Sequence, residues 1–97
     1  MIYRYKQVFL KRFDRYRQKE QTIIWQAVVQ IQHHLETGKA PHGLRITLLF
    51  RKKGLGAVYE ARATDAIRIV YVTKENLTVF SLLGNHEDVR QFIRTRR

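Results

Sequence analysis

The sequence lacks cysteine and has a single proline among its 97 residues. Without cysteine there are no disulfides, thiolate metal ligands or cysteine nucleophiles, which is compatible with a reducing cytoplasm. No apolar run approaches the roughly 20 residues that a membrane helix needs. The N-terminus, Met1 to Lys6, is basic but has no apolar segment behind it, so we expect neither a signal peptide nor a membrane partner.

Acidic residues are also few. Eight Asp and Glu stand against 19 Lys and Arg, which gives a formal net charge of +11. Such a surplus attracts polyanions, so the charge alone does not choose among nucleic acid, a ribosome, an acidic membrane surface and an acidic protein. A soluble domain with a merely basic surface is the plainer interpretation of the charge alone. A hydrophobic content of 44% at this length predicts one folded domain over residues 1–97.

Apolar spacing predicts two helices in the first half of the chain. Aromatic residues recur at helical spacing from Phe9 to Tyr16, after a short strand expected within residues 2–8. A longer helix is expected from Thr22, its predicted cap, to Gly38, its stop signal, because apolar residues repeat along one face. Together the two helices predict an αα-hairpin.

After Pro41 the apolar period changes from 3.6 residues to 2, which predicts strands. An extended segment is expected over residues 45–50, followed by a basic loop over residues 51–56 that lacks a nucleotide-binding signature. Asn85 is the expected cap of a final helix. Between the loop and this cap, short turns predict an antiparallel meander of three strands, at about 57–63, 67–72 and 77–83.

The expected fold is therefore α+β. An N-terminal strand and a two-helix hairpin pack on a twisted antiparallel sheet of about four strands, with a short C-terminal helix. Strand alternation places the small and apolar side chains of the meander on the face that suits the helical hairpin. Glu60, Arg62 and Arg68 then gather on the opposite face, which is expected to be uncovered. His86 lies just beyond the last strand of the meander.

These four residues suit the cleavage of RNA by its own 2′-hydroxyl. That reaction needs a base for the hydroxyl proton, cations for the crowded phosphate, and an acid for the departing 5′-oxygen. Arginine matches phosphate oxygens with a planar fork and a permanent charge, and histidine transfers protons near neutral pH. Surface ion pairs and a helix-cap residue are the structural alternative, and the residues taken alone favour that alternative.

Three motifs resemble the RelE/ParE toxin superfamily. They are residues 58–63 (VYEARA), 67–72 (IRIVYV) and 83–89 (LGNHEDV). The family pattern is an aromatic and Arg-bearing strand, an Arg-x-x-Tyr strand, and a Gly-x-His/Arg segment that opens the final helix. The helical hairpin also matches in length and order, so the resemblance covers nearly the whole chain.

The resemblance implies a ribosome-dependent mRNA endonuclease, the toxin of a type II toxin–antitoxin system, which a cognate antitoxin neutralises. By position, Arg68 matches the family's phosphate-contacting arginine, and Arg62 matches a basic residue on the neighbouring strand. His86 falls where many members have a catalytic His or a basic residue. Glu60 stands where a nuclease often has a basic residue, so it is either a general base or the mark of a weaker site. We expect no cofactor and no metal.

Four further basic residues are expected to contact RNA: Arg51, Lys52 and Lys53 in the basic loop, and Arg90 after the last motif. Many family members have Tyr at the position of Arg90, so the role of that Tyr is missing or reassigned here. Two alternatives to the nuclease stay open: a ParE-like toxin that acts on DNA gyrase, and a catalytically degenerate module that binds RNA or the antitoxin. The antitoxin is expected to be acidic where it contacts this chain, because the charge of +11 favours complementarity.

Overall fold

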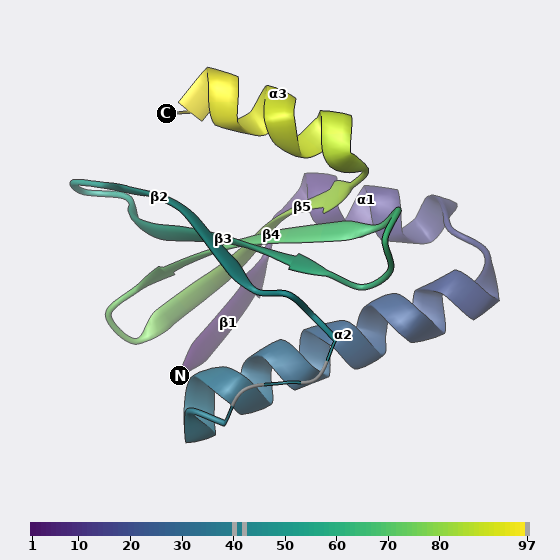
Figure 1. Ribbon diagram of the computed structural model, residues 1–97, viewed down its shortest axis with the longest axis horizontal. Helices are drawn as coiled ribbons and strands as arrows, with labels where there is room; N and C mark the ends of the chain where they lie inside the picture. The colour runs from purple at the N-terminus through teal and green to yellow at the C-terminus, as the bar shows by residue number, and fades with distance from the viewer. Residues whose placement is uncertain (40, 42, 97) are drawn as a thin grey trace.

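The computed structural model describes residues 1–39, 41 and 43–96. In chain order the elements are β1 (Ile2–Tyr5), α1 (Gln7–Arg15), α2 (Gln18–Thr37), β2 (Thr47–Lys52), β3 (Gly56–Arg62), β4 (Arg68–Lys74), β5 (Leu77–Gly84) and α3 (His86–Arg96). The predicted α+β class is confirmed. The sheet lies between α3 on one side and α2 on the other (Figure 1). No helix of the described residues is long and apolar enough to cross a membrane.

The sheet is mixed and has five strands in the order β1-β5-β4-β3-β2. Strands β2 to β5 pair antiparallel, as the predicted meander requires, whereas β1 pairs with β5 in parallel, with Ile2 opposite Leu77. The prediction of about four antiparallel strands is therefore wrong in the number of strands and in the direction of one pair. A parallel pair needs a long crossover between its strands, and no local pattern in a short strand identifies a partner so distant in sequence.

Helix α2 begins four residues before its predicted cap. Arg17 is the N-cap, and its backbone N–H donates to Glu20 Oε1 at 3.2 Å. Thr22 lies inside the helix, where its hydroxyl donates to Gln18 O at 3.1 Å. The cap prediction is wrong because the polar residues 18–21 are good helix formers and extend the helix beyond its apolar stripe. The predicted end is confirmed, since Gly38 closes the helix in the left-handed conformation with φ of 76°.

The main core lies between the sheet and the helical hairpin of α1 and α2. At its centre, Phe80 of β5 is fully buried and stacks on Tyr5, with ring centroids 5.1 Å apart. The rings of Phe9 and Tyr71 each lie 5.9 Å from Phe80. The predicted apolar stripe of α2 completes this core with Ile24, Ala27, Val28 and Ile31.

A second, smaller apolar cluster covers the opposite face of the sheet. It consists of Val58, Val70, Val72 and Leu82 from the sheet and Val89 and Phe92 from α3. The prediction that this face is uncovered is therefore wrong, because α3 lies across it (Figure 1). The valines that share this face with the charged residues of β3 and β4 give the apolar side of a short helix a surface on which to pack.

The segment predicted as a basic loop is strand at both of its ends. Arg51 and Lys52 pair with the start of β3, so the loop shrinks to a turn over residues 53–55. The register shifts between Leu48 and Phe50, so these two side chains lie on opposite faces of the sheet. Because strand side chains alternate, Arg51 and Lys52 also lie on opposite faces of the sheet.

Candidate functional site

Three neighbouring strands bring the predicted site residues to one end of the sheet. Arg62, the last residue of β3, is paired with Arg68, the first residue of β4. Arg68 is paired in turn with Gly84, the last residue of β5. His86 follows two residues later as the first residue of α3. Glu60, Arg62 and Arg68 share one face of the sheet, as strand alternation predicts, and the row of Arg62, Arg68 and Gly84 leads directly to His86.

Glu60 and Arg68 form a buried ion pair. Arg68 Nη1 donates to Glu60 Oε1 at 3.1 Å, and the two residues are only 9% (Arg68) and 7% (Glu60) exposed. Arg68 Nε is also buried and has no hydrogen-bond partner within the described residues. A buried charge is stable only when it is paired, so Glu60 compensates the charge of Arg68 and fixes its position. The structure brings these two predicted residues into contact but leaves neither open to solvent.

Arg62 and His86 are the accessible residues at this end of the sheet. The backbone N–H of Arg62 donates to Leu44 O at 2.7 Å, which fixes the end of β3. Its half-buried guanidinium makes no hydrogen bond or ion pair with another described residue. The exposed ring of His86 likewise has no partner within the described part of the chain. Both side chains are therefore free to meet an incoming anion.

A reciprocal cap positions the turn that carries His86. The backbone N–H of Asn85 donates to Asp88 Oδ2, and the backbone N–H of Asp88 donates to Asn85 Oδ1, both at 2.9 Å. The predicted cap at Asn85 is confirmed. A Cβ at Gly84 would collide with the Asp88 carboxylate and lie 2.7 Å from Arg12 Nη1, so a larger residue there would displace these two side chains. The backbone of His86 is thus held in a defined place while its ring stays free.

Arg12 of α1 is part of this site, and the sequence analysis did not identify it. Its Nη1 lies 2.9 Å from Asp88 Oδ2 and donates to Leu83 O at 3.4 Å. Arg12 thereby ties α1 to the start of α3. In the sequence Arg12 is one of several basic residues on a helix, and nothing local indicates that its partner lies near the other end of the chain.

The other predicted RNA-contacting residues divide between two places. Arg51, Lys52 and Lys53 lie at the opposite end of β3, at the tip of the β2–β3 hairpin (Figure 1). Arg90 lies one helical turn beyond His86 on the same side of α3, with its Nη1 3.9 Å from Glu87 Oε2. The structure therefore places Arg90 beside the row and the cations of the hairpin far from it.

Solved structures show that this arrangement is the fold of RelE- and YafQ-type toxins. A copper-bound mutant toxin from Helicobacter pylori matches with a TM-score of 0.63 and 17% identity over 92% of this chain and 98% of that one. A chain of the RelE–RelB complex from Pyrococcus horikoshii matches with a TM-score of 0.63 and 14% identity, over 87% and 92% of the two chains. YafQ from E. coli gives 0.62 and 13%, over 90% and 94%.

No protein-family model matches the sequence, and no curated protein matches it significantly. The fold that the resemblance implies is thus confirmed over nearly the whole chain. A shared fold at this identity does not assign residue roles, which depend on the geometry of the site. Within residues 1–39, 41 and 43–96, no three His, Asp or Glu side chains gather closely enough to hold a metal ion.

Proposed function

We propose that the protein is the toxin of a type II toxin–antitoxin system and cleaves mRNA on the ribosome, in the cytoplasm. One observation carries the proposal: Arg62, Arg68 and Gly84 stand in register at one end of a RelE-like sheet, with His86 directly beyond them. The net charge of +11 supports a polyanionic target. Matches to the RelE–RelB and DinJ–YafQ complexes support a cognate antitoxin as partner.

In the proposed reaction, the 2′-hydroxyl of the RNA attacks the adjacent phosphorus and the bond to the 5′-oxygen breaks. The products are a 2′,3′-cyclic phosphate and a 5′-hydroxyl. Arg62 offers its unpaired guanidinium to the phosphate oxygens as charge accumulates on them. His86 accepts the proton of the 2′-hydroxyl and returns it to the departing 5′-oxygen, which balances the reaction.

Glu60 and Arg68 support this chemistry from inside the protein. The carboxylate of Glu60 is buried and bonded to Arg68, so its part is to hold the arginine and not to act as the general base. Arg68 in turn lies between Arg62 and Gly84, the last residue of β5 before His86. Arg90, one turn along α3, extends the positive surface toward a neighbouring phosphate of the substrate.

The same ion pair favours a second candidate function, a catalytically degenerate module that binds RNA or the antitoxin. Glu60 neutralises Arg68, which reduces the positive charge that a phosphate meets at the row. With less charge to stabilise the transition state, the row binds RNA without cutting it.

A translation extract programmed with a defined mRNA separates these functions. We expect primer extension to show cuts that need ribosomes, and that vanish in Arg62→Ala and His86→Ala. Arg4→Ala, which removes an exposed cation on β1, is the matched control and should cut as the wild type does. Intact mRNA together with retained RNA binding would favour the degenerate module, and gyrase-linked DNA breaks would favour a ParE-like toxin.

A further inference from the structure

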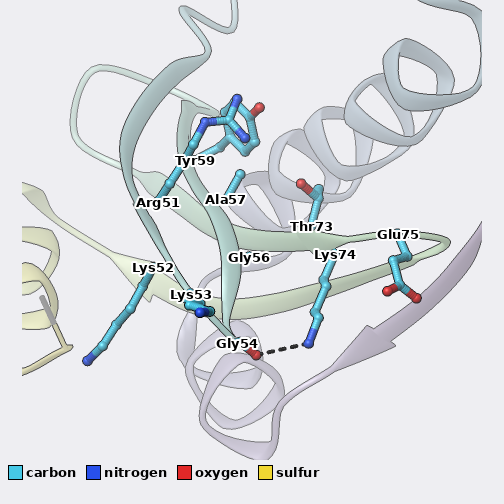
Figure 2. A pocket seen from close by; sticks show the side chains of 10 residues that line it. All are labelled: Arg51, Lys52, Lys53, Gly54, Gly56, Ala57, Tyr59, Thr73, Lys74 and Glu75. Carbon is cyan, nitrogen blue, oxygen red and sulfur yellow. Dashed lines mark hydrogen bonds between the residues drawn. The ribbon is translucent and has the colours of Figure 1, made fainter.

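An open hollow with a volume of about 490 Å³ lies at the tip of the β2–β3 hairpin. Figure 2 shows the side chains that line it. Ala57 and Thr73, which are register partners in β3 and β4, lie between Arg51 and Tyr59 on one side and Lys74 on the other. None of these residues belongs to the row of Arg62, Arg68 and Gly84, so the hollow is a separate feature of the surface.

The hollow carries positive side chains that form no ion pair with a described residue. Arg51, Lys53 and Lys74 line it, with Glu75 as the carboxylate among the lining residues. None of the four takes part in an ion pair with another described residue. Lys74 Nζ donates to Gly54 O at 3.1 Å, which holds one of the cations in place. An anion that enters therefore meets Arg51 and Lys53 without having to displace a carboxylate from them.

Lys52 also lines the hollow, but its amino group is engaged outside it. Its Nζ donates to Arg96 O at the end of α3, at 3.0 Å, and its side chain points away from the other lining residues (Figure 2). The prediction that residues 51–53 form one RNA-contacting loop is thereby sharpened. Arg51 and Lys53 are available to a ligand in the hollow, whereas Lys52 satisfies a carbonyl at a helix C-terminus.

Two hydroxyl groups in the hollow also lack partners. Tyr59 and Thr73 are half-buried, and neither hydroxyl forms a hydrogen bond with another described residue. The ring of Tyr59 stacks on Tyr71, with centroids 5.4 Å apart, so the direction of its hydroxyl is fixed. Cations bind phosphate or carboxylate alike, but free hydroxyls match a 2′-hydroxyl, the group that distinguishes RNA from DNA. The hydroxyls therefore favour RNA over an acidic peptide.

The hollow and the row lie at opposite ends of β3 and on opposite faces of the sheet. The ring of Tyr59 packs with the core under the helical hairpin, whereas Glu60 and Arg62 face the α3 side. Five residue steps separate Ala57 from Arg62, a distance of about 17 Å along a strand. An RNA segment in the hollow is therefore not the segment whose bond is cut at the row.

We propose that the hollow is a second RNA site, which binds the ribose-phosphate backbone of a segment other than the one cleaved. Arg51 and Lys53 contact the phosphates, and the hydroxyls of Tyr59 and Thr73 bond to a 2′-hydroxyl. Either the mRNA outside the cleavage site or ribosomal RNA supplies this chemistry. The site extends the proposed function but does not depend on catalysis, because binding and cutting use different residues.

Charge reversal tests the phosphate contacts. Arg51→Glu/Lys53→Glu is compared with Arg4→Glu/Lys19→Glu, a control pair of exposed cations that lowers the net charge equally. We expect the first pair to weaken binding of a fluorescent single-stranded RNA about tenfold more than the control does, in 0.1 M salt. The slope of log affinity against log salt should also fall by about 1.4, for two lost phosphate contacts. Equal losses in the two pairs overturn the proposal.

Removal of the hydroxyls tests the ribose contacts. Tyr59→Phe/Thr73→Val keeps the shapes of both side chains, and we expect it to abolish the preference for RNA over DNA of the same sequence while DNA binding is unchanged. If the wild type binds RNA and DNA equally, ribose recognition is refuted. A polyglutamate peptide that binds the wild type more tightly than RNA, and loses that binding in Arg51→Glu/Lys53→Glu, would assign the hollow to an acidic protein segment instead.

Two binding experiments, one with vacant ribosomes and one with free mRNA, distinguish the sources of the RNA. Weaker sedimentation of Arg51→Glu/Lys53→Glu with vacant ribosomes, relative to the control pair, assigns ribosomal RNA. A loss confined to free mRNA assigns the message, and a loss in neither arm overturns the proposal. Both arms measure binding alone and need no cleavage. An absence of mRNA cleavage with these binding differences intact would therefore refute the nuclease and leave the second RNA site standing.

Discussion

The two faces of the sheet are closed in different ways. Against α1 and α2, the sheet packs through aromatic rings around Phe80, together with the aliphatic side chains of α2. Against α3 it packs through a smaller set of mainly valine side chains, and here it buries Glu60 and Arg68 as an ion pair. Apolar burial stabilises a fold, whereas a buried ion pair contributes little net stability. The first face thus provides stability, and the second holds charged groups in place.

The largest effect is expected from a substitution at the centre of the first face. We expect Phe80→Ala to lower the free energy of unfolding by about 3–5 kcal/mol, because the rings around it lose their packing partner and a cavity remains. Urea denaturation measures the change. Leu48→Ala, at an exposed apolar residue, is the control and should change stability by about 0.5 kcal/mol or less. A similar small effect for Phe80→Ala would contradict the assignment of stability to this face.

The next effect concerns the ion pair on the second face. Glu60→Ala leaves the charge of Arg68 buried without compensation, which should cost about 3 kcal/mol. The double variant Glu60→Met/Arg68→Met removes both charges and should be more stable than Glu60→Met or Arg68→Met alone, as measured by the same urea denaturation. Additive losses in the double variant would show that the pair is not a coupled buried unit.

Sequence reasoning was most successful where the pattern is local. Strand alternation predicted that Arg62 and Arg68 share a face, and the Asn-x-x-Asp spacing accompanies the confirmed cap at Asn85. These features depend on neighbours within one hairpin or one helical turn. Local patterns alone are therefore sufficient to place Arg62, Arg68 and His86 at one end of the sheet.

The remaining features depend on contacts between distant parts of the chain. Nothing local indicates that β1 joins β5 in parallel, or that Arg12 pairs with Asp88. Alternation put Glu60 and Arg68 on one face but did not reveal that α3 packs on the same face, which changes an expected surface pair into a buried one. The free hydroxyls of the hollow were also missed, because only the assembled sheet shows which polar groups lack partners.

The smallest expected effect is a loss of stability at alkaline pH, which comes from the first face. Burial raises the pKa of Tyr71 above its ordinary value, and the nearby Tyr59 adds to the shift. Since the folded state keeps this phenol neutral, the unfolded chain ionises first, and the stabilisation is complete below about pH 10 and is lost as the pH rises further. We expect the free energy of unfolding to fall above pH 10, by on the order of 1 kcal/mol at pH 11 for this group, and the melting temperature to fall with it.

Tyr71→Phe is the matched variant for this measurement and should show a smaller alkaline loss than the wild type. Part of the loss should persist, because burial and the hydrogen bond to Glu36 raise the pKa of Tyr3 to about 12. Parallel curves for Tyr71→Phe and the wild type from pH 9 to 12 would show that Tyr71 contributes nothing to the pH dependence.

The division of the two faces is tested most directly by the rate of ribosome-dependent mRNA cleavage in His86→Ala, measured beside its melting temperature. His86 is exposed, and its ring has no partner within the described residues, so its loss should leave the melting temperature unchanged. As the proposed proton-transfer group, its loss should slow cleavage by about 100-fold or more. We predict a stable protein that no longer cuts, and cleavage at the wild-type rate by His86→Ala would contradict the assignment of function to this end of the sheet.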